Sequence, residues 1–355
     1  MISEYHMEAI SLFSGAGGDT LGLESVGFKV VAFSENNKDA IQSHLNNFPE
    51  SKWLGKDVKG DITKILDTEF QEYHGRIKVI FAGFPCQGFS NAGKKDTNDP
   101  RNKMFYEFLR AVRIIQPEWI IGENVAGLLT KKTDDGESKV IDVIQKEFQE
   151  IGYSLVYKVY DTSSVGVPQS RKRLIIVGNR IGISYELPVF NLMKQGVSTI
   201  TEESLEGAIE CNLSPPPECI LTLTKKMEVT GTPHSYLLTK LADGRISFGK
   251  RDSPTHAEVL DLRKPCKTII CAYSFQPRLY VCVRNTDEKL YIRCLTKKEL
   301  AQIQGFPANH QFHGKNESVI KQIGNAVPAK LISEIMGSML RTSQPKPIAQ
   351  RKIRR

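Results

Sequence analysis

Long hydrophobic runs are missing from the 355-residue sequence. No apolar segment approaches the roughly 18 residues that a helix needs to cross a membrane, which predicts a protein that does not span one. The first residues, Met1 to Glu4, begin no basic segment followed by an apolar stretch and a small-residue cleavage site, so no export signal is visible. We therefore expect a cytoplasmic protein if the host is a prokaryote, or a nuclear one if it is a eukaryote.

Cysteine is scarce, and its spacing forms no recognisable pattern. The seven cysteines are an odd number, and no two form a Cys-x-x-Cys pair. This argues against a disulfide framework and against a zinc site, and we expect no metal. The formal net charge of +8 is compatible with a polyanionic partner, although many proteins that never meet nucleic acid carry a similar excess.

Short apolar, β-branched runs alternate with helix-like stretches in the first half of the chain. The predicted strands are residues 9–13, 29–34, 79–83, 119–123, 154–160 and 174–178. The predicted helices are residues 18–26, 38–46, 104–115 and 140–151. This alternation predicts an α/β core with a doubly wound, mainly parallel sheet covered by helices on both faces.

Regularity is lost after the core predicted for residues 1–180. Prolines and turn-like glycines predict a smaller, loop-rich domain inserted over residues 181–291. Residues 292–341 are predicted to return to the core, with a capped helix over 296–303 and another over 329–340. The basic segment 342–355 is predicted to be a disordered tail.

A glycine-rich turn, Leu12 to Gly18, closes the first predicted strand and opens the first helix. Glycines at such a turn let the backbone approach a nucleotide-like ligand closely. Glu35, at the end of the second strand, is placed to accept hydrogen bonds from ribose hydroxyls. The pair points to an adenosine-containing cofactor, yet a plain tight turn or a nicotinamide-binding fold would look alike.

A thiol and a carboxyl group follow two neighbouring strands. Cys86 and Glu123 come at the carboxyl ends of their strands, where open α/β sheets bind ligands. A lone cysteine is more often a buried hydrophobe, but here the two groups converge beside the expected cofactor. They suit attack on cytosine, whose C5 accepts a methyl group only after a thiolate adds to C6, while a carboxyl group stabilises the charge developing at N3.

A basic run, Gln169 to Arg173, precedes the strand at 174–178. The side chains of such a run usually lie on a solvent-exposed face of the protein. Beside a reacting base, however, the guanidinium groups of Arg171 and Arg173 could hold its exocyclic oxygen and a phosphate, and lower the pKa of a thiol.

Taken together, six segments resemble, in order, the motifs of the cytosine-C5 DNA methyltransferase family over most of the chain outside the inserted region. They are Phe13-Ser14-Gly15-Ala16-Gly17-Gly18, Pro85-Cys86-Gln87, Glu123-Asn124-Val125, Gln169-x-Arg171-x-Arg173, the stretch from Leu295 to Pro307, and Gly324-Asn325-Ala326-Val327-Pro328. The resemblance implies a Rossmann-like class I methyltransferase fold that uses S-adenosyl-L-methionine.

The resemblance also implies roles for individual residues. The catalytic set is Cys86, Glu123, Arg171 and Arg173. The cofactor set is Phe13, Gly15, Gly17, Glu35, Asn36, Asp61, Ile62, Pro85, Asn325 and Val327. One departure is Asp19, where the family often has an apolar or small residue; we expect it to be tolerated because an acid favours the start of a helix.

By the same resemblance, residues 181–291 recognise the DNA target. The enzyme must flip the cytosine out of the duplex to reach it. The predicted DNA-contacting residues are Gln87, Ser90, Gln169, Arg245, Arg251, Thr268 and Ile269, a set drawn from the inserted region, the basic run and the loop after Cys86.

Alternatives remain open at this point. A tRNA cytosine-C5 methyltransferase would use the same thiol and carboxyl, but such relatives carry Cys-Phe-Thr where this chain has Cys271-Ala272-Tyr273. A catalytically silent DNA-binding relative is disfavoured by the intact catalytic set. A nicotinamide-dependent oxidoreductase would not explain Pro85-Cys86-Gln87.

The position of the glycine-rich turn favours a stand-alone enzyme without an N-terminal regulatory module. We expect a modification enzyme that works beside a restriction endonuclease, by analogy with the family. A monomer is the default for a protein that reads an asymmetric site.

Overall fold

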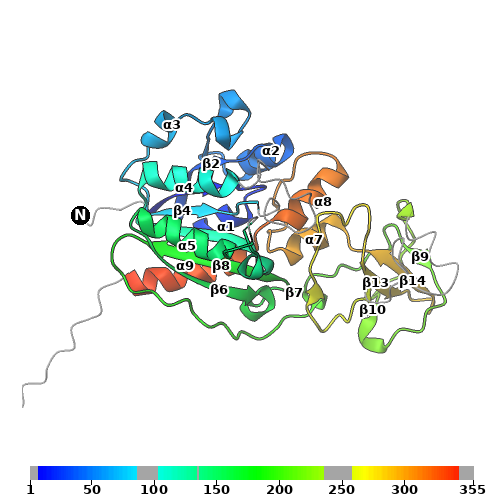
Figure 1. Cartoon of the computed structure of the whole chain (residues 1–355). Helices are drawn as coiled ribbons and strands as arrows, with labels where there is room; N and C mark the ends of the chain where they lie inside the picture. The colour runs from blue at the N-terminus through cyan, green and yellow to red at the C-terminus, as the bar shows by residue number, and fades with distance from the viewer. Residues whose placement is uncertain (1–6, 86–102, 134–135, 236–257, 344–355) are drawn as a thin grey trace, which may run out of the picture.

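The computed structural model describes residues 7–85, 103–133, 136–235 and 258–343. A large sheet with its helices forms one part of the molecule, and a small sheet forms the other, with α7 and α8 between them (Figure 1). The predicted tail at 344–355 lies outside the described residues. Within the described part of the chain, no helix has the length and apolar character needed to cross a membrane.

The large sheet has seven strands in the order β3-β2-β1-β4-β5-β8-β6. Their bounds are β1 (Met7–Leu12), β2 (Phe28–Ser34), β3 (Lys52–Trp53), β4 (Val79–Ala82), β5 (Trp119–Val125), β6 (Ser154–Asp161) and β8 (Lys172–Asn179). All neighbours pair in parallel except β8, which runs antiparallel to both β5 and β6. The prediction of a doubly wound, mainly parallel sheet is confirmed.

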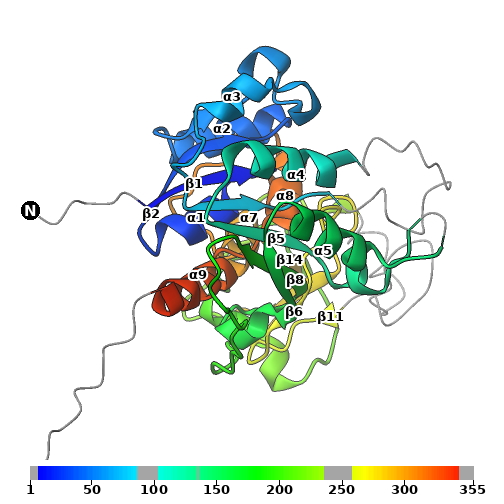
Figure 2. The same cartoon turned by 60° about the vertical axis from the view of Figure 1, so that its left-hand side comes forward.

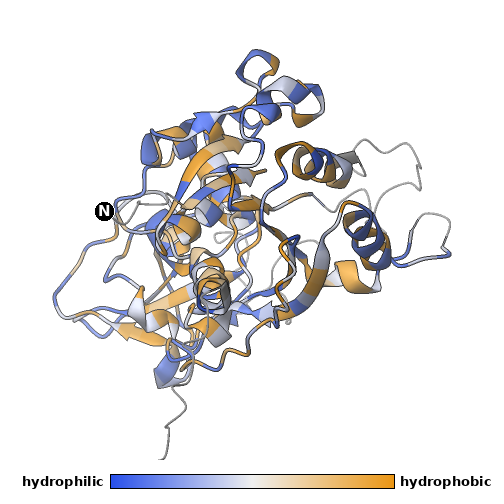
Figure 3. Cartoon of the chain, turned by 90° about the vertical axis from the view of Figure 1, so that its left-hand side faces the viewer, coloured by the Kyte–Doolittle hydropathy of each residue, from blue (hydrophilic) through white to orange (hydrophobic). Residues whose placement is uncertain are grey.

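Helices cover both faces of this sheet. They are α1 (Gly18–Glu24), α2 (Lys38–Asn47), α3 (Asp67–Gln71), α4 (Lys103–Ile115), α5 (Val140–Glu150) and α9 (Ala329–Ser343). Helices α4 and α5 pack on one face, and α1 and α9 pack on the other (Figure 2). The central strands are largely hydrophobic, as expected when both faces are covered (Figure 3). On α4, Phe105, Phe108 and Val112 share the buried stripe at helical spacing.

The C-terminal helix α9 reaches the first helix because α1 carries glycines on the facing side. A Cβ atom on Gly18 would lie 2.5 Å from the carbonyl oxygen of Val327, and one on Gly22 would lie 2.6 Å from that of Ala329. No larger side chain fits at these contacts without moving the backbone. The glycines therefore hold the last segment of the fold against the first.

The second sheet has the order β10-β13-β14-β9, with β11 also paired to β13. Its strands are β9 (Ile209–Glu210), β10 (Ile220–Thr222), β11 (Glu258–Val259), β13 (Leu279–Arg284) and β14 (Leu290–Cys294), and a separate pair joins β7 (Gln169–Ser170) to β12 (Cys266–Lys267). Strand β14 runs to Cys294, past the boundary predicted at residue 291. The return segment forms α7 (Lys297–Ile303) and α8 (Asn316–Asn325), which share one hydrophobic core with the small sheet.

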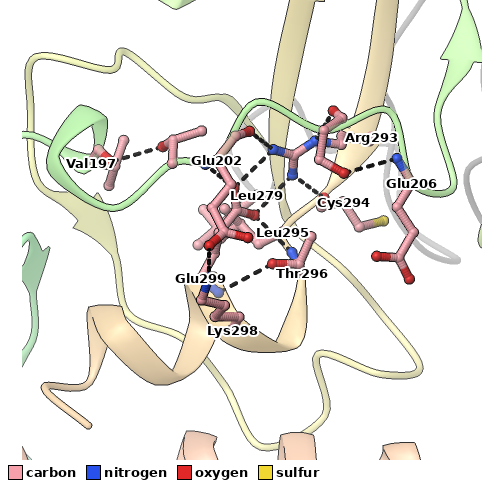
Figure 4. Close-up of polar contacts among 12 residues, drawn as sticks. Val197, Glu202, Glu206, Leu279, Arg293, Cys294, Leu295, Thr296, Lys298 and Glu299 are labelled. Atoms are coloured by element: carbon pink, nitrogen blue, oxygen red, sulfur yellow. Dashed lines mark hydrogen bonds and ion pairs between the residues drawn. The ribbon is translucent and has the colours of Figure 1, made fainter. Parts of the chain in front are cut away.

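A buried ion pair joins the small sheet to α7 (Figure 4). Arg293 on β14 and Glu299 on α7 have 0% exposed side-chain surface, and both terminal nitrogens of Arg293 donate to the carboxylate at 2.8 Å. Arg293 also donates to the carbonyl oxygens of Glu202 and Ser204. Glu299 closes a capping box with Thr296, as its sequence position predicted. The network fixes three segments to one another.

Replacing Arg293 with methionine should lower the free energy of unfolding by about 3 kcal/mol, because the Glu299 carboxylate is left buried without its partner. Urea unfolding followed by circular dichroism measures this. The double variant Arg293→Met with Glu299→Gln removes the stranded charge, and we expect it to regain part of the loss. A single variant as stable as the parent would contradict this account of the network.

Candidate active site

The glycine-rich turn after β1 has an unusual backbone. Phe13 has a φ of 58°, and Gly15 and Gly17 have φ of 55° and 86°. The left-handed region is uncommon for a residue with a side chain and is often found at functional sites. The end of β2 holds the turn, because the backbone N–H of Ser14 donates to the carbonyl of Ser34 at 3.0 Å. The partly buried Phe13 ring is thereby fixed at the end of the strand.

A fixed carboxylate lies beside this turn. Glu35 accepts hydrogen bonds from the backbone N–H groups of Gly15, Asn36 and Asn37 at 2.9, 2.9 and 2.8 Å. A Cβ atom on Gly60, which has a φ of 74°, would lie only 1.8 Å from the carbonyl oxygen of Glu35. Only glycine fits there, so the segment before Asp61 is packed directly against Glu35.

Asp61 and Ile62 follow at this contact. The Asp61 carboxylate accepts from the backbone N–H and hydroxyl of Thr63 and pairs with Lys64 at 2.9 Å. The Thr63 hydroxyl, followed by Lys64, lowers the pKa of Asp61. Ile62 is buried. Asp61 and Ile62 therefore belong to a hydrogen-bonded turn next to Glu35.

His310 supports the glycine-rich turn after β1, and the sequence did not predict this role. Its Nε2 lies 3.1 Å from the carbonyl oxygen of Ala16 and 3.3 Å from the amide nitrogen of Asn47. Both amide hydrogens of Asn47 are already donated to the carbonyls of Ser43 and Gln311, so Nε2–H of His310 donates to Ala16. Burial lowers the pKa of His310 to about 4, which keeps the ring neutral.

Two distant parts of the chain meet around Gly83. A Cβ atom there would lie 3.5 Å from Cγ2 of Val327 and 3.9 Å from Oε2 of Glu123. Asn325, at the end of α8, is exposed on the same segment as Val327. The structure thus brings Val327 beside Glu123, a neighbourhood that spacing in the sequence could not reveal.

Glu123 and Arg173 form the central polar contact. Nε of Arg173 lies 2.7 Å from Oε1 of Glu123, and the two side chains are only 13% and 11% exposed. Burial raises the pKa of Glu123, and the charges of Arg173 and Arg171 oppose that rise. The result is a carboxyl group that one guanidinium holds in place and whose pKa lies above its usual range.

Arg171 has a different environment from Arg173. It is 3% exposed, and its guanidinium donates to the carbonyl oxygens of Ile269, Gly324 and Ala326 at 3.1, 3.1 and 3.3 Å. Burial lowers its pKa to about 9. Its contacts therefore hold the segment before Val327 in place, and its predicted contact with the reacting base stays a prediction.

Asn124, within the Glu123-Asn124-Val125 segment, has a positioning role that the sequence did not assign. Its buried side-chain amide donates to the carbonyl of Phe84 at 3.0 Å, and its oxygen accepts from the backbone N–H of Val125. This bond ties the end of β5 to the segment that leads into Pro85, the last described residue before Cys86.

Five predicted residues lie outside the described part of the chain: Cys86, Gln87, Ser90, Arg245 and Arg251. Their roles remain predictions from the sequence.

Two predicted DNA-contacting side chains are buried instead. Gln169 is 0% exposed and Ile269 is 1% exposed. The Gln169 amide accepts from the backbone N–H of Ile269 and donates to Gln304. In this arrangement both side chains pack the core against the segment of Ile269, so neither is exposed for the predicted contact with DNA. Thr268 is exposed, and its hydroxyl donates to the carbonyl of Ser170.

The comparisons with known proteins agree with this geometry. The family model described as C-5 cytosine-specific DNA methylase matches residues 7–341. The chain belongs to this family. It is 32% identical to the Type II methyltransferase M.FnuDI of Fusobacterium nucleatum over 98% of both chains. It is therefore a DNA cytosine-C5 methyltransferase that uses a methyl donor, and the predicted family and reaction are confirmed.

Solved structures show the same fold. The crystal structure of Spodoptera frugiperda DNMT2 matches with a TM-score of 0.67 and 20% identity, over 94% of this chain and 99% of that one. The methyltransferase EhMeth of Entamoeba histolytica matches with a TM-score of 0.65 and 19% identity, over 96% and 99%. At this identity the likeness concerns the methylase fold alone.

Proposed function

We propose that this cytosine-C5 methylase uses S-adenosyl-L-methionine to methylate a cytosine flipped out of duplex DNA within one specific sequence. The observation that carries the mechanism is the buried Glu123–Arg173 pair at 2.7 Å, at the end of the strand next to the one that leads to Cys86. A buried, hydrogen-bonded carboxyl group at this edge is suited to proton transfer with a base.

The glycine-rich corner fits the proposed cofactor. A Cβ atom on Gly15 would meet nothing within 4 Å, so there is open space at this turn. Glu35 is fixed by three backbone N–H groups and offers its remaining lone pairs to ribose hydroxyls. The residues that would hold the cofactor are Phe13, Gly15, Gly17, Glu35, Asn36, Asp61, Ile62, Pro85, Asn325 and Val327. When bound, S-adenosyl-L-methionine supplies an electrophilic methyl group.

Cys86 activates the base in this proposal. Its thiolate adds to C6 of cytosine, a carbon–sulfur bond forms, and the displaced electron pair makes C5 nucleophilic. Glu123 donates its proton to N3 as negative charge develops there. Once C5 has been methylated, a base removes the C5 proton, the thiolate of Cys86 leaves and N3 returns its proton to Glu123, which restores the aromatic ring.

Arg173 orients the proton donor. Because its Nε binds Oε1 of Glu123, the other carboxyl oxygen is left on the side of Gly83. The charge of Arg173 also stabilises the carboxylate that forms after proton transfer. Arg171 holds the segment of Gly324 and Ala326 behind this pair.

The biological role is proposed from the relatives. The name Type II methyltransferase, carried by M.FnuDI, belongs to an enzyme that aligns over nearly the whole chain. We propose that this protein acts as a monomer in the cytoplasm and protects DNA from a partner restriction endonuclease.

Transfer of a tritiated methyl group from S-adenosyl-L-methionine to unmethylated duplex DNA, and in parallel to tRNA, tests this function. We expect label in DNA alone, and bisulfite sequencing should place it at cytosines of one repeated sequence. Label confined to tRNA, or no label in either substrate, would overturn the proposal.

A further inference from the structure

A tryptophan side chain holds the main chain of Glu35. Trp53 is the last residue of β3, the short strand at the edge of the large sheet, and it pairs with Phe33 near the end of β2. Its half-buried indole donates through Nε1–H to the backbone carbonyl of Glu35 at 3.1 Å. The one polar atom of this ring is thus directed at the residue that is proposed to bind ribose.

Gly60 packs against the same carbonyl group. The position of a Cβ atom on Gly60 lies 1.8 Å from the carbonyl oxygen of Glu35 and 3.1 Å from Nε1 of Trp53. Gly60 has a φ of 74°, in the left-handed region, and its N–H donates to the carbonyl of Gly55 at 2.8 Å. The carbonyl of Glu35, the indole of Trp53 and the backbone of Gly60 therefore meet at one point, directly before Asp61.

Glu35 is held from two sides as a result. Its carboxylate accepts from three backbone N–H groups, one of which belongs to Gly15 in the glycine-rich turn. Its carbonyl accepts from Trp53 and contacts the segment that leads into Asp61. The first contacts fix the carboxylate relative to the glycine-rich turn, and the second fix the same residue relative to the turn at Asp61. Trp53 thus joins two parts of the proposed cofactor site.

We propose that Trp53 is a positioning residue for the cofactor, because its indole holds Glu35 against Gly60 and so sets the spacing between the ribose-binding carboxylate and the turn at Asp61. The inference rests on the proposed binding of S-adenosyl-L-methionine at this corner. A ligand that contacts both groups binds more tightly when their spacing is fixed beforehand, since less freedom is lost on binding. Loss of the indole N–H should therefore weaken cofactor binding and leave the chemical step intact.

Trp53→Phe, which keeps an aromatic ring and removes the N–H donor, tests this role. We expect the Kd for S-adenosyl-L-homocysteine, the product left after methyl transfer, to rise about fivefold in equilibrium dialysis, as for the loss of one hydrogen bond. The KM for S-adenosyl-L-methionine should rise in parallel, while kcat stays at the parent value. Trp119→Phe, at the start of β5 and thus at the opposite end of that strand from Glu123, is the matched control and should leave both constants unchanged.

Fluorescence gives a second measurement, which does not depend on how well Trp53→Phe folds. The chain has two tryptophans, so Trp119→Phe leaves Trp53 as the single indole fluorophore. We expect its emission to change saturably as S-adenosyl-L-homocysteine is added, with a midpoint equal to the Kd from dialysis. The emission of Trp119, which is the remaining indole in Trp53→Phe, should not respond.

A third variant separates this inference from the proposed function. Glu35→Gln removes one of the two carboxylate acceptors for ribose hydroxyls and should raise the Kd by about tenfold or more. If Glu35→Gln weakens binding while Trp53→Phe binds as tightly as the parent, or while the emission of Trp53 does not respond, the role of Trp53 is overturned and the cofactor site stands. If neither substitution changes the Kd, the proposed cofactor site is wrong and the inference fails with it.

Discussion

Replacing Cys86 with alanine should abolish methyl transfer. The variant lacks the group that forms the covalent bond to C6, so we expect the single-turnover rate to fall by about 10⁵-fold or more. The described residues proposed to hold the cofactor are unchanged, so binding of S-adenosyl-L-methionine should persist. Radiolabel transfer and equilibrium dialysis measure the two properties separately.

The same variant allows a direct test of the covalent step. Duplex DNA made with 5-fluorocytosine should trap the parent enzyme as a stable adduct, because fluorine cannot leave C5 as the proton does. Cys86→Ala should give no adduct. Cys219→Ala, which removes a partly exposed thiol next to β10, serves as the control and should be trapped normally. Turnover at the parent rate without Cys86 would refute the mechanism.

Replacing Glu123 with glutamine should slow methyl transfer by roughly 10²- to 10⁴-fold. Glutamine has nearly the same shape, and its oxygen can still accept from Arg173. It cannot deliver a proton to N3, however, so the charge that develops during thiolate addition is left without its acid. We therefore expect a loss in rate at saturating substrates and little change in affinity for DNA or cofactor.

Single-turnover kinetics with excess enzyme isolate this step from product release. Glu118→Gln is a suitable control, because Glu118 lies just before β5, at the opposite end of the strand, and pairs on the surface with Lys78. That variant should keep the parent rate. A Glu123→Gln rate within about threefold of the parent, a difference of less than 1 kcal/mol, would exclude proton donation by this residue.

The large sheet could be predicted because each of its strands and helices is indicated by a short, continuous sequence pattern. The buried parallel strand β4 is a short, continuous apolar run, β5 begins with one, and the helix between them shows apolar residues at helical spacing. The carboxyl ends of such strands define a ligand edge, so placing Glu35 and Glu123 there needed only the strand assignment. Element ends moved by one to a few residues, as at β5, which extends to Val125.

The smaller sheet could not be predicted in the same detail. It depends on pairing between strands far apart in the chain, such as β9 with β14, and its strands of two or three residues carry too short a pattern to recognise. Only the hairpin of β13 and β14 has a readable signal, in the apolar runs Leu279–Arg284 and Leu290–Cys294.

Side-chain roles at the site also depended on long-range contacts. The basic run predicted the same role for Arg171 and Arg173. Burial and hydrogen bonding distinguish them, because Arg171 binds backbone carbonyl groups whereas Arg173 holds Glu123. Asp19 looked like a helix-start acid, and it is indeed in the first turn of α1. Its burial against Ser11 could not be read from the sequence.

The contacts of Arg171 with Gly324 and Ala326 span 153 and 155 residues. During synthesis on the ribosome, the strand that carries Glu123 is therefore made long before the segment of Gly324 and Ala326 that Arg171 binds. Until α9 emerges and docks on the glycines of α1, the nascent chain lacks this part of the site. We therefore expect methylating activity only after this segment has been made, so that a product cut short before it should be inert.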